Sequence, residues 1–484
     1  MAQAKDLIAI ENFNDGGLAS SKWSGVKNSL YRMIGFDPHT RPGVLDVEQK
    51  LTKISSTTVD ELCKNRVECS NGSTFFFSSE SGKIWEVTSA NVVRLVHTTT
   101  PVAGQAKCLG AVEYQGKVIW ATQSRLHYIT VSNSDDNNWA ANAVEDWQTF
   151  GVTGLEFHPM IDHSGTLLLF IGDGNRVAQY DGALDIFSAN ALDIRTPLRV
   201  KALGEIGTDL LIGTYVASNI VGAEVFRWNT WDESFANSDK VPEIGINAFL
   251  KSDNSVIIQA GNKGNLYWYD GTNLELFMRV PGDYSVSASG EVYPEAVANR
   301  NGQMLFGFSN VTGNPAPQLV YRIARHDRSY NWIMDQPYPI SERSGGEFVT
   351  TGLEIGCIAL RGEEILVAWQ NGATCGIDKL DLTAKLDGAY FESRVMVVNR
   401  EQQMNMAEIF AAFALLPAST AIEFFLSKNY ADYGSALDTD DDTDRNIVIT
   451  DKEATEFNTL QLKVKATVSS NNAPLIESVA VRIR

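Results

Sequence analysis

The sequence lacks the features that mark several large classes of protein. No run reaches the roughly 18 consecutive apolar residues that a membrane-spanning helix needs, and the first residues, MAQAKDLIAIENFNDGG, hold no apolar core of the signal-peptide kind. No G-x-S-x-G elbow, GxxxxGK[ST] loop or H-E-x-x-H pair is present, and no G-x-G-x-x-G follows an expected strand. We therefore predict a non-enzymatic protein without a membrane span, and we assign no catalytic residue, cofactor or metal.

Cysteine is scarce, odd in number and scattered, which excludes a disulfide framework. We expect buried, reduced side chains in a protein made in a bacterial cytoplasm. The five positions are Cys63, Cys69, Cys108, Cys357 and Cys375.

Metal-ligand patterns are equally sparse. The six histidines show no metal spacing, and the pair His158 and His163 is too loose to support a site. The acidic run LDTDDDTDRN has Thr443 and Ile449 where an EF-hand loop would need Gly and Glu. A solvated loop tip is preferred there, with a calcium site of another kind left open. The aspartates concerned are Asp438, Asp440, Asp441, Asp442 and Asp444.

Basic side chains are fewer than acidic ones, 40 against 59, which gives a net charge of −19. A surface of this sign repels phosphate backbones, so sequence-independent binding of nucleic acid is disfavoured. A ring-shaped assembly of such chains can still let DNA pass through without retaining it.

What the chain does contain is a repeated unit. A short apolar run leads through a Gly- or Asn-containing turn to a second strand, which often ends in an aromatic residue. The seven copies are centred near Phe75, Val118, Leu168, Leu211, Ile257, Leu305 and Leu366, with spacings of 43, 50, 43, 46, 48 and 61 residues. A period near 40–50 residues is typical of one propeller blade. We predict a β-propeller of six or seven blades over residues 61–386, with a split arrangement, a solenoid or stacked sandwiches as alternatives.

Turn residues and tryptophans fit these repeats. Tyr180-Asp181-Gly182 and Tyr269-Asp270-Gly271 recur at matching places, and Asp-Gly favours a tight hairpin with Gly at positive φ. Large rings suit the gaps between blades. The tryptophans on or beside the repeats are Trp85, Trp120, Trp228, Trp268 and Trp369.

The pattern changes at both ends. From about residue 387 to 484, six apolar runs predict a compact β-sandwich, although AEIFAAFALL is also compatible with a short buried helix. Residues 1–60 show no repeat, and we predict an extended arm that packs outside the body or on a partner. Its large apolar side chains, among them Phe13, Trp23, Tyr31 and Phe36, favour burial against a neighbouring subunit or the outside of the propeller. The alternative is that the arm folds back on its own sandwich domain and only adds stability.

The N-terminal residues Gly16-Gly17-Leu18, Asn28, Gly35 and Arg41-Pro42-Gly43 form a series that resembles the start of tailed-phage virion proteins. The family comprises the propeller-containing tail nozzle, hub and DNA-stabilisation proteins of short-tailed phages. The ending PLIESVAVRIR is similar to that class, whereas the Gln-Gln-Pro that many nozzle proteins carry after Gly-Gly is missing. The direct match covers about 45 residues, as counted along the chain.

The resemblance implies a virion component without catalytic residues, forming a ring around the tail axis. It would contact copies of itself and neighbouring virion proteins such as an adaptor, a portal or tail fibres. The expected contact residues are Phe13, Gly16, Gly17, Trp23, Asn28, Tyr31, Phe36, Arg41 and Pro42. The alternative is a carbohydrate-binding or carbohydrate-cleaving propeller, such as a phage receptor-binding protein or glycoside hydrolase, with Trp231, Trp332 or Trp369 stacking on sugars.

Overall fold

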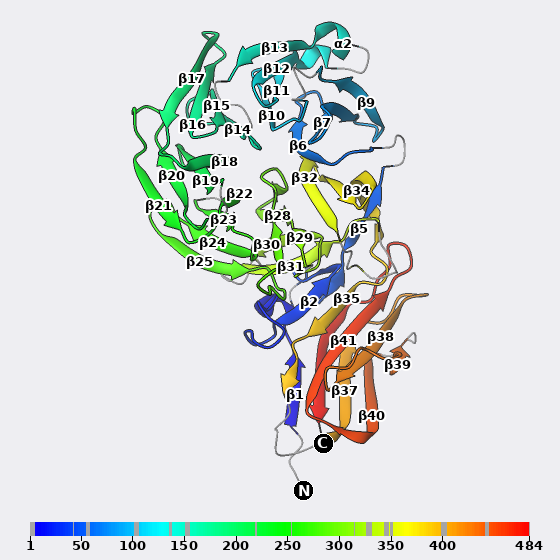
Figure 1. Cartoon of the computed structure of the whole chain (residues 1–484). Helices are drawn as coiled ribbons and strands as arrows, with labels where there is room; N and C mark the ends of the chain where they lie inside the picture. The colour runs from blue at the N-terminus through cyan, green and yellow to red at the C-terminus, as the bar shows by residue number, and fades with distance from the viewer. Residues whose placement is uncertain are drawn as a thin grey trace.

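The computed structural model describes residues 5–41, 43–54, 59–100, 106–134, 138–150, 155–217, 220–252, 254–313, 315–325, 332–342, 348, 352–397, 404–440 and 445–483. In this part of the chain the fold is almost entirely β-structure, arranged as a ring of sheets above a sandwich (Figure 1). The α-helices α1 (Phe13–Gly16) and α2 (Trp139–Asn142) and a 3-10 turn at Val131–Asn133 are single turns. The prediction of an all-β propeller with a C-terminal sandwich is confirmed.

Seven four-stranded antiparallel units form the ring in the described residues. The first four are β6 (Cys63–Glu68), β7 (Thr74–Ser78), β8 (Lys83–Val87), β9 (Val93–Thr98); β10 (Gly110–Tyr114), β11 (Lys117–Ala121), β12 (Arg125–Thr130), β13 (Val144–Thr149); β14 (Met160–His163), β15 (Leu168–Asp173), β16 (Arg176–Asp181), β17 (Ile186–Asp193); and β18 (Leu198–Ile206), β19 (Asp209–Val216), β20 (Ala223–Trp228), β21 (Asn237–Val241).

The remaining three are β22 (Ile246–Lys251), β23 (Val256–Ala260), β24 (Asn265–Tyr269), β25 (Leu274–Arg279); β27 (Val297–Arg300), β28 (Gln303–Gly307), β30 (Val320–Arg325), β31 (Trp332–Tyr338); and β32 (Leu353–Arg361), β33 (Glu364–Asn371), β34 (Thr374–Lys385), β5 (Gln49–Lys53). The first strand of each blade contacts the first strand of the next, and β32 contacts β6, so the ring is closed. Two minor pairs, β26 (Ser289–Glu291) with β29 (Ser309–Thr312) and β3 (Phe36–Asp37) with β4 (Asp46–Val47), decorate it.

The apolar runs that marked the repeats are the second strands of the blades. Their side chains are buried on both faces because each blade is covered by a neighbour on either side. Phe75, Phe76 and Phe77 of β7, for example, are wholly inaccessible, and Trp120 of β11 packs against Phe77 from the next blade. Trp85, Trp228 and Trp369 are buried as well, as predicted, whereas Trp268 is only half-buried.

The last blade is closed by a strand from the other end of the propeller. β5, which precedes the first blade in sequence, pairs antiparallel with β34 as the outer strand of the seventh. Residues 1–60 are therefore not a separate arm: they contribute strands to both bodies. This part of the domain division is corrected, because long-range strand pairing leaves no local repeat in the sequence.

The sandwich has two sheets. One contains β1 (Lys5–Ile10), β42 (Ile476–Ile483), β37 (Met404–Phe413) and β40 (Asn446–Phe457) in that order. The other runs from β2 (Leu30–Ile34) through β35 (Tyr390–Ser393), β41 (Thr459–Thr467) and β38 (Ala421–Lys428) to β39 (Asp438–Asp440), with β36 (Met396–Val397) also on β41. Most of the segment AEIFAAFALL, Ala407–Phe413, belongs to strand β37, so its helical alternative is wrong.

The propeller and the sandwich share one continuous sheet. β2 pairs in parallel with β31, the outer strand of the sixth blade, and antiparallel with β35 of the sandwich. Figure 1 shows β2 in blue at this junction. The amide of Gly35 donates to the carbonyl of Gln336 at 2.8 Å, which extends the contact beyond the paired residue Ile34. A strand shared by two sheets fixes their relative orientation.

A buried charge cluster lies beside this junction. Arg322 on β30 donates to Asp335 on β31, to Glu48 and to Asp37, and all four side chains are shielded from water. Burial raises the pKa of Glu48 above its ordinary value, against the opposing charge of Arg322. The guanidinium thereby connects the propeller to the N-terminal segment.

The two Tyr-Asp-Gly turns differ in one respect from expectation. Gly271 has φ of +94°, as predicted, but Gly182 is not left-handed; Asp185 supplies the positive φ, 54°. The aspartate acts alike in both turns: Asp181 accepts the amide of Ala183 at 2.9 Å, and Asp270 accepts that of Thr272 at 2.8 Å. Gly182 is needed for space instead, because a Cβ there would overlap Gln115.

Candidate functional site: a cavity on the outer face of the sandwich

Alternation along β41 separates two faces of its sheet. Leu460, Leu462 and Val464 point into the sandwich core and are buried, while Lys463 and Lys465 point the other way and stay partly accessible. This outward face is the one that carries polar side chains.

Strand register assembles these polar side chains into a row. Arg32 on β2 lies opposite Glu392 on β35, Glu392 lies opposite Lys463 on β41, and Lys463 lies opposite Phe425 on β38. Directly opposed residues share a face of a sheet. The row therefore alternates cation, carboxylate, cation and ring across four strands.

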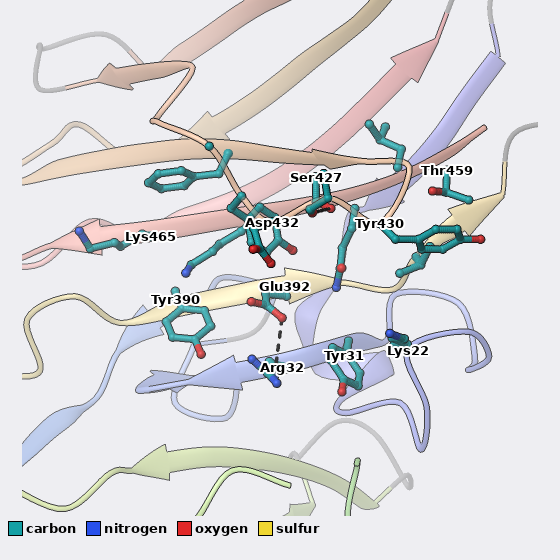
Figure 2. Close-up of a pocket in the computed structure, with 18 of the residues that line it drawn as sticks. Lys22, Tyr31, Arg32, Tyr390, Glu392, Ser427, Tyr430, Asp432, Thr459 and Lys465 are labelled. Carbon is teal, nitrogen blue, oxygen red and sulfur yellow. Dashed lines mark hydrogen bonds and ion pairs between the residues drawn. The ribbon is translucent and has the colours of Figure 1, made fainter. Parts of the chain in front are cut away.

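A cavity of about 770 Å³ lies over this row. One wall comes from the N-terminal segment and the other from the loop after β38, while β35 and β41 form the floor (Figure 2). The lining residues used below are Lys22, Tyr31, Arg32, Tyr390, Glu392, Phe425, Tyr430, Asp432, Tyr433, Thr459, Lys463 and Lys465.

The charges in the cavity are held by specific partners. Arg32 Nε lies 3.7 Å from Glu392 Oε2, the contact drawn as a dashed line in Figure 2. Burial acts to lower the pKa of Arg32, but Glu392, Tyr390 and Tyr31 outweigh it, so the pKa is raised and the side chain stays cationic. Lys465 Nζ pairs with Glu423 at 2.7 Å.

Lys463 sits among aromatic rings. Its Nζ lies 4.3 Å from the ring centroid of Tyr390, 5.5 Å from that of Tyr433 and 5.9 Å from that of Phe425. Cation–π contacts of this kind hold an ammonium group in place. The Lys463 ammonium is therefore held at the cavity by three rings.

Three polar atoms at the cavity are buried without a hydrogen-bond partner: the hydroxyls of Tyr433 and Thr459 and Nε of Arg32. Burial, with the nearby charge of Glu392, raises the pKa of Tyr433, so its hydroxyl stays protonated. Buried polar groups normally have partners, and each of these three can take one more.

An aromatic pair stands at one edge of the cavity. Tyr430 packs edge-on against Trp23, with ring centroids 5.3 Å apart, and both rings are exposed to solvent. Asn429 and Tyr430 have φ of 50° and 64°, a conformation that side chains rarely adopt. The backbone of the turn therefore presents the Tyr430 ring in a fixed position beside the N-terminal segment.

The structure brings together some of the residues predicted as partner contacts. Gly16 packs against Asn28, since a Cβ on Gly16 would overlap the Asn28 carbonyl, whereas a Cβ on Gly17 would meet Ile333 of β31. The Leu30 amide donates to the Gly17 carbonyl at 2.9 Å. Gly17 and Asn28 both have positive φ, 55° and 61°. These three residues therefore make contacts within the chain.

Other predicted contacts are buried in the chain itself. Phe13 and Phe36 both pack on Phe391 of β35, with centroids 5.8 and 5.9 Å apart, and are inaccessible. The prediction that they bury against a neighbouring subunit is wrong for these two. Arg41 stays exposed near Asp46, at 3.9 Å, and Pro42 lies outside the described residues.

Trp23 and Tyr31 thus remain accessible, the second as part of the cavity. The cavity residues of β35, β38 and β41 were missed from the sequence. The alternation Gln461-Lys463-Lys465 did signal a polar outer face, but nothing local indicated that residues 22–32 would cover it.

The tryptophans proposed to stack on sugars occupy three different environments. Trp369 is buried between blades, which is the packing role. Trp332 is partly buried beside Arg325, whose guanidinium lies 4.5 Å from the ring centroid. Trp231 is 79% exposed on the loop after β20.

A second cavity of about 600 Å³ opens at the centre of the propeller. Two of its carboxylates have ion-pair partners: Lys201 Nζ lies 3.1 Å from Glu291, and Glu295 pairs with Arg66. Lys64 Nζ stands 3.9 Å from the ring centroid of Tyr293. The lining holds three lysines, at positions 64, 107 and 201, and four glutamates, at positions 80, 156, 291 and 295.

Within the described ranges, no group of three His, Cys, Asp or Glu side chains could hold a metal ion. Asp438 and Asp440 lie in β39, whereas Asp441, Asp442 and Asp444 lie outside the described residues. All five cysteines are free and buried, and burial raises the pKa of the Cys63 thiol. Among the helices that the structure describes, none is long and apolar enough to cross a membrane.

Comparison with known proteins shows likeness of fold alone. No protein-family model and no curated protein matches the chain. The extracellular domain of a B. thetaiotaomicron protein described as a hybrid two-component system matches with a TM-score of 0.46 and 12% identity, over 77% of this chain and 44% of that one. The chain thus spans less than half of that relative.

Two smaller propellers match in the same way. A streptogramin B lyase matches at a TM-score of 0.44 and 11% identity, over 69% of this chain and 98% of the lyase. The Dos1 propeller matches at 0.43 and 9%, over 69% and 95%. These are β-propellers, as this chain is.

Proposed function

We propose that the protein is a structural component of a tailed-phage virion, at the nozzle, hub or collar, where it assembles as a ring around the tail axis. The single observation that carries the proposal is the sheet that runs without interruption from the sixth blade through β2 into the sandwich. A particle component that bears load needs domains of fixed relative orientation, and this sheet together with the Arg322 cluster supplies it.

An exposed apolar surface supports contact between copies. The Tyr114 hydroxyl donates to the Leu167 carbonyl at 2.9 Å and accepts the Gly182 amide at 3.1 Å, so two turns of the third blade lie side by side. They expose Leu167 (69%), Leu184 (68%) and the neighbouring Ile186. Apolar side chains grouped in this way mark interaction surfaces more often than single ones do.

Net charge is consistent with a passage for DNA. A ring of copies, each with −19 charges, repels the duplex and lets it slide rather than bind. In this proposal the protein contacts neighbouring virion proteins and has no catalytic role.

Electron microscopy of the purified chain and of phage particles that contain it tests the proposal. We expect closed rings and density for a propeller with an attached sandwich on the tail axis. Leu184→Asp should weaken ring formation, whereas Val286→Asp, at an exposed apolar position outside this surface, should not. A chain that stays monomeric at high concentration and is absent from particles contradicts the proposal.

A further inference from the structure

The sandwich cavity has a composition unlike the rest of the molecule. It is lined by four cationic side chains, Lys22, Arg32, Lys463 and Lys465, against two carboxylates, Glu392 and Asp432, and a third carboxylate, Glu423, pairs with Lys465. The chain as a whole carries −19. A locally positive cavity in an acidic protein attracts an anionic ligand and concentrates it at that place.

The rings restrict the class of anion. Tyr31, Tyr390, Tyr430, Tyr433 and Phe425 all line the cavity, and Figure 2 shows Tyr31, Tyr390 and Tyr430 on different sides of it. Aromatic faces bind ligands that have flat apolar surfaces of their own. An inorganic anion has no such surface, so the lining favours an organic ligand that carries both a charge and an apolar face.

The polar atoms restrict it further. The hydroxyls of Tyr433 and Thr459 are buried without a partner and can each donate and accept. Asp432 can only accept, so it needs a ligand that donates hydrogen bonds. A ligand with several hydroxyls and one carboxylate satisfies these groups together: its hydroxyls bond to the tyrosine, threonine and aspartate, and its carboxylate faces Lys463.

We propose that this cavity binds an acidic saccharide, a short sugar chain that carries a carboxylate. The sugar's apolar face packs on Tyr390 or on the exposed Trp23–Tyr430 pair, and its carboxylate lies near the ring-held ammonium of Lys463. A volume of about 770 Å³ lies within the size of small-molecule sites, about 300–1,000 Å³.

This inference goes beyond the proposed function, since a ring component needs no ligand for its rigidity. Saccharide binding also differs from the sequence-based alternative, which placed sugar contacts on propeller tryptophans rather than on the sandwich.

The test uses the full chain and isothermal titration with 3′-sialyllactose and a hyaluronan tetrasaccharide, beside neutral lactose and inorganic pyrophosphate. We expect at least one acidic sugar to bind about tenfold more tightly than lactose. No binding of either acidic sugar, or equal binding of lactose, overturns the proposal. Pyrophosphate binding as tight as that of the sugar does so too, because charge alone would then be recognised.

Two variants test whether the saccharide binds in this cavity. Lys463→Gln should weaken binding about tenfold by removing the cation, and Tyr433→Phe about threefold by removing one hydroxyl. The matched control is Lys117→Gln, because Lys117 also stands over three rings, those of Tyr128, Trp147 and Tyr180, but in the propeller.

Lys117→Gln should bind as the parent does, and thermal melting should show that all three variants fold. Unchanged binding in Lys463→Gln, or lost binding in Lys117→Gln, overturns the location. Ring formation is measured separately on the same samples. Rings without saccharide binding refute this inference alone, and saccharide binding without rings refutes the virion role alone.

Discussion

Arg322 Nη2 donates to Asp37 Oδ1 at 2.9 Å across 285 positions of the sequence, and both side chains are buried. The same guanidinium contacts Glu48 and Asp335. One cation thus compensates three buried carboxylates on the propeller and the N-terminal segment.

Replacing this cation should be costly. Arg322→Met leaves the carboxylates without their main partner, and we expect a loss of about 3–5 kcal/mol in the free energy of unfolding, measured by urea denaturation. Arg176→Met is the matched control, since Arg176 pairs with an exposed Asp193 at 3.6 Å and should lose less than about 1 kcal/mol. Equal losses in the two variants would contradict the role assigned to the buried cluster.

A chain truncated before Val44 tests whether residues 1–43 stabilise their own chain or connect neighbouring subunits. It removes β1, which pairs with β42, and β2, which links β31 to β35. We expect the shortened chain to melt several degrees lower, because these strands and Phe13 belong to the shared core. Differential scanning calorimetry with light scattering checks this. A truncated chain that melts normally but fails to form rings would instead support a contact between these residues and a neighbouring subunit.

Gly356 allows the seventh blade to approach the first. A Cβ there would overlap the Cys63 carbonyl on β6. Gly356→Ala should therefore destabilise the protein by about 1–3 kcal/mol. Gly434→Ala, where a Cβ meets nothing and φ is not positive, should have little effect. Thermal melts of both variants measure this, and matching melting temperatures would mean that the two blades are less tightly packed than described.

Stability should fall in acid partly through His127. Its Nδ1 accepts the Asp146 amide at 3.1 Å, and Nε2 lies 3.0 Å from Thr122 Oγ1. Burial lowers the pKa of His127 to about 4, despite Glu145 and Asp146 nearby. Between about pH 6.5 and 4 the unfolded chain takes up a proton that the folded chain does not. The free energy of unfolding should therefore decrease by about 3 kcal/mol as the pH is lowered through this range.

His127→Gln retains a polar side chain that can bond to Thr122 but cannot titrate, so its free energy of unfolding should depend less steeply on pH in this window. His158 and His163 also have lowered pKa values and contribute equally to both proteins. Parallel pH profiles for parent and variant would contradict the assignment.

The propeller could be predicted because each blade carries its own local signal. The apolar runs at Phe75 or Ile257 are second strands, whose double burial excludes polar residues and makes the repeat visible. The roles of β1, β2 and β5 could not be read in this way, because their partners lie hundreds of residues away. The error at Gly182 arose because the left-handed position of that turn is Asp185, three residues after the glycine, and the Asp-Gly pair does not reveal it.

The cavity could not be predicted from the sequence for the same reason: its residues come from distant segments. Arg32, Glu392 and Lys463 are polar residues in three separate segments, and only strand register makes them neighbours. Trp23 and Tyr31 were predicted as contact residues because large apolar side chains favour burial. The sequence did not show which surface they would meet.

Closure of the ring by β5 also fixes when the protein can finish folding. During synthesis β5 emerges before the first blade, but its partner β34 emerges after the last, and β1 waits for β42 almost to the final residue. Until then both early strands leave the ribosome with unpaired edges, which invite pairing with other nascent chains. Translation interrupted before β34 therefore yields no closed propeller, so such incomplete products lack the ring of blades that assembly requires.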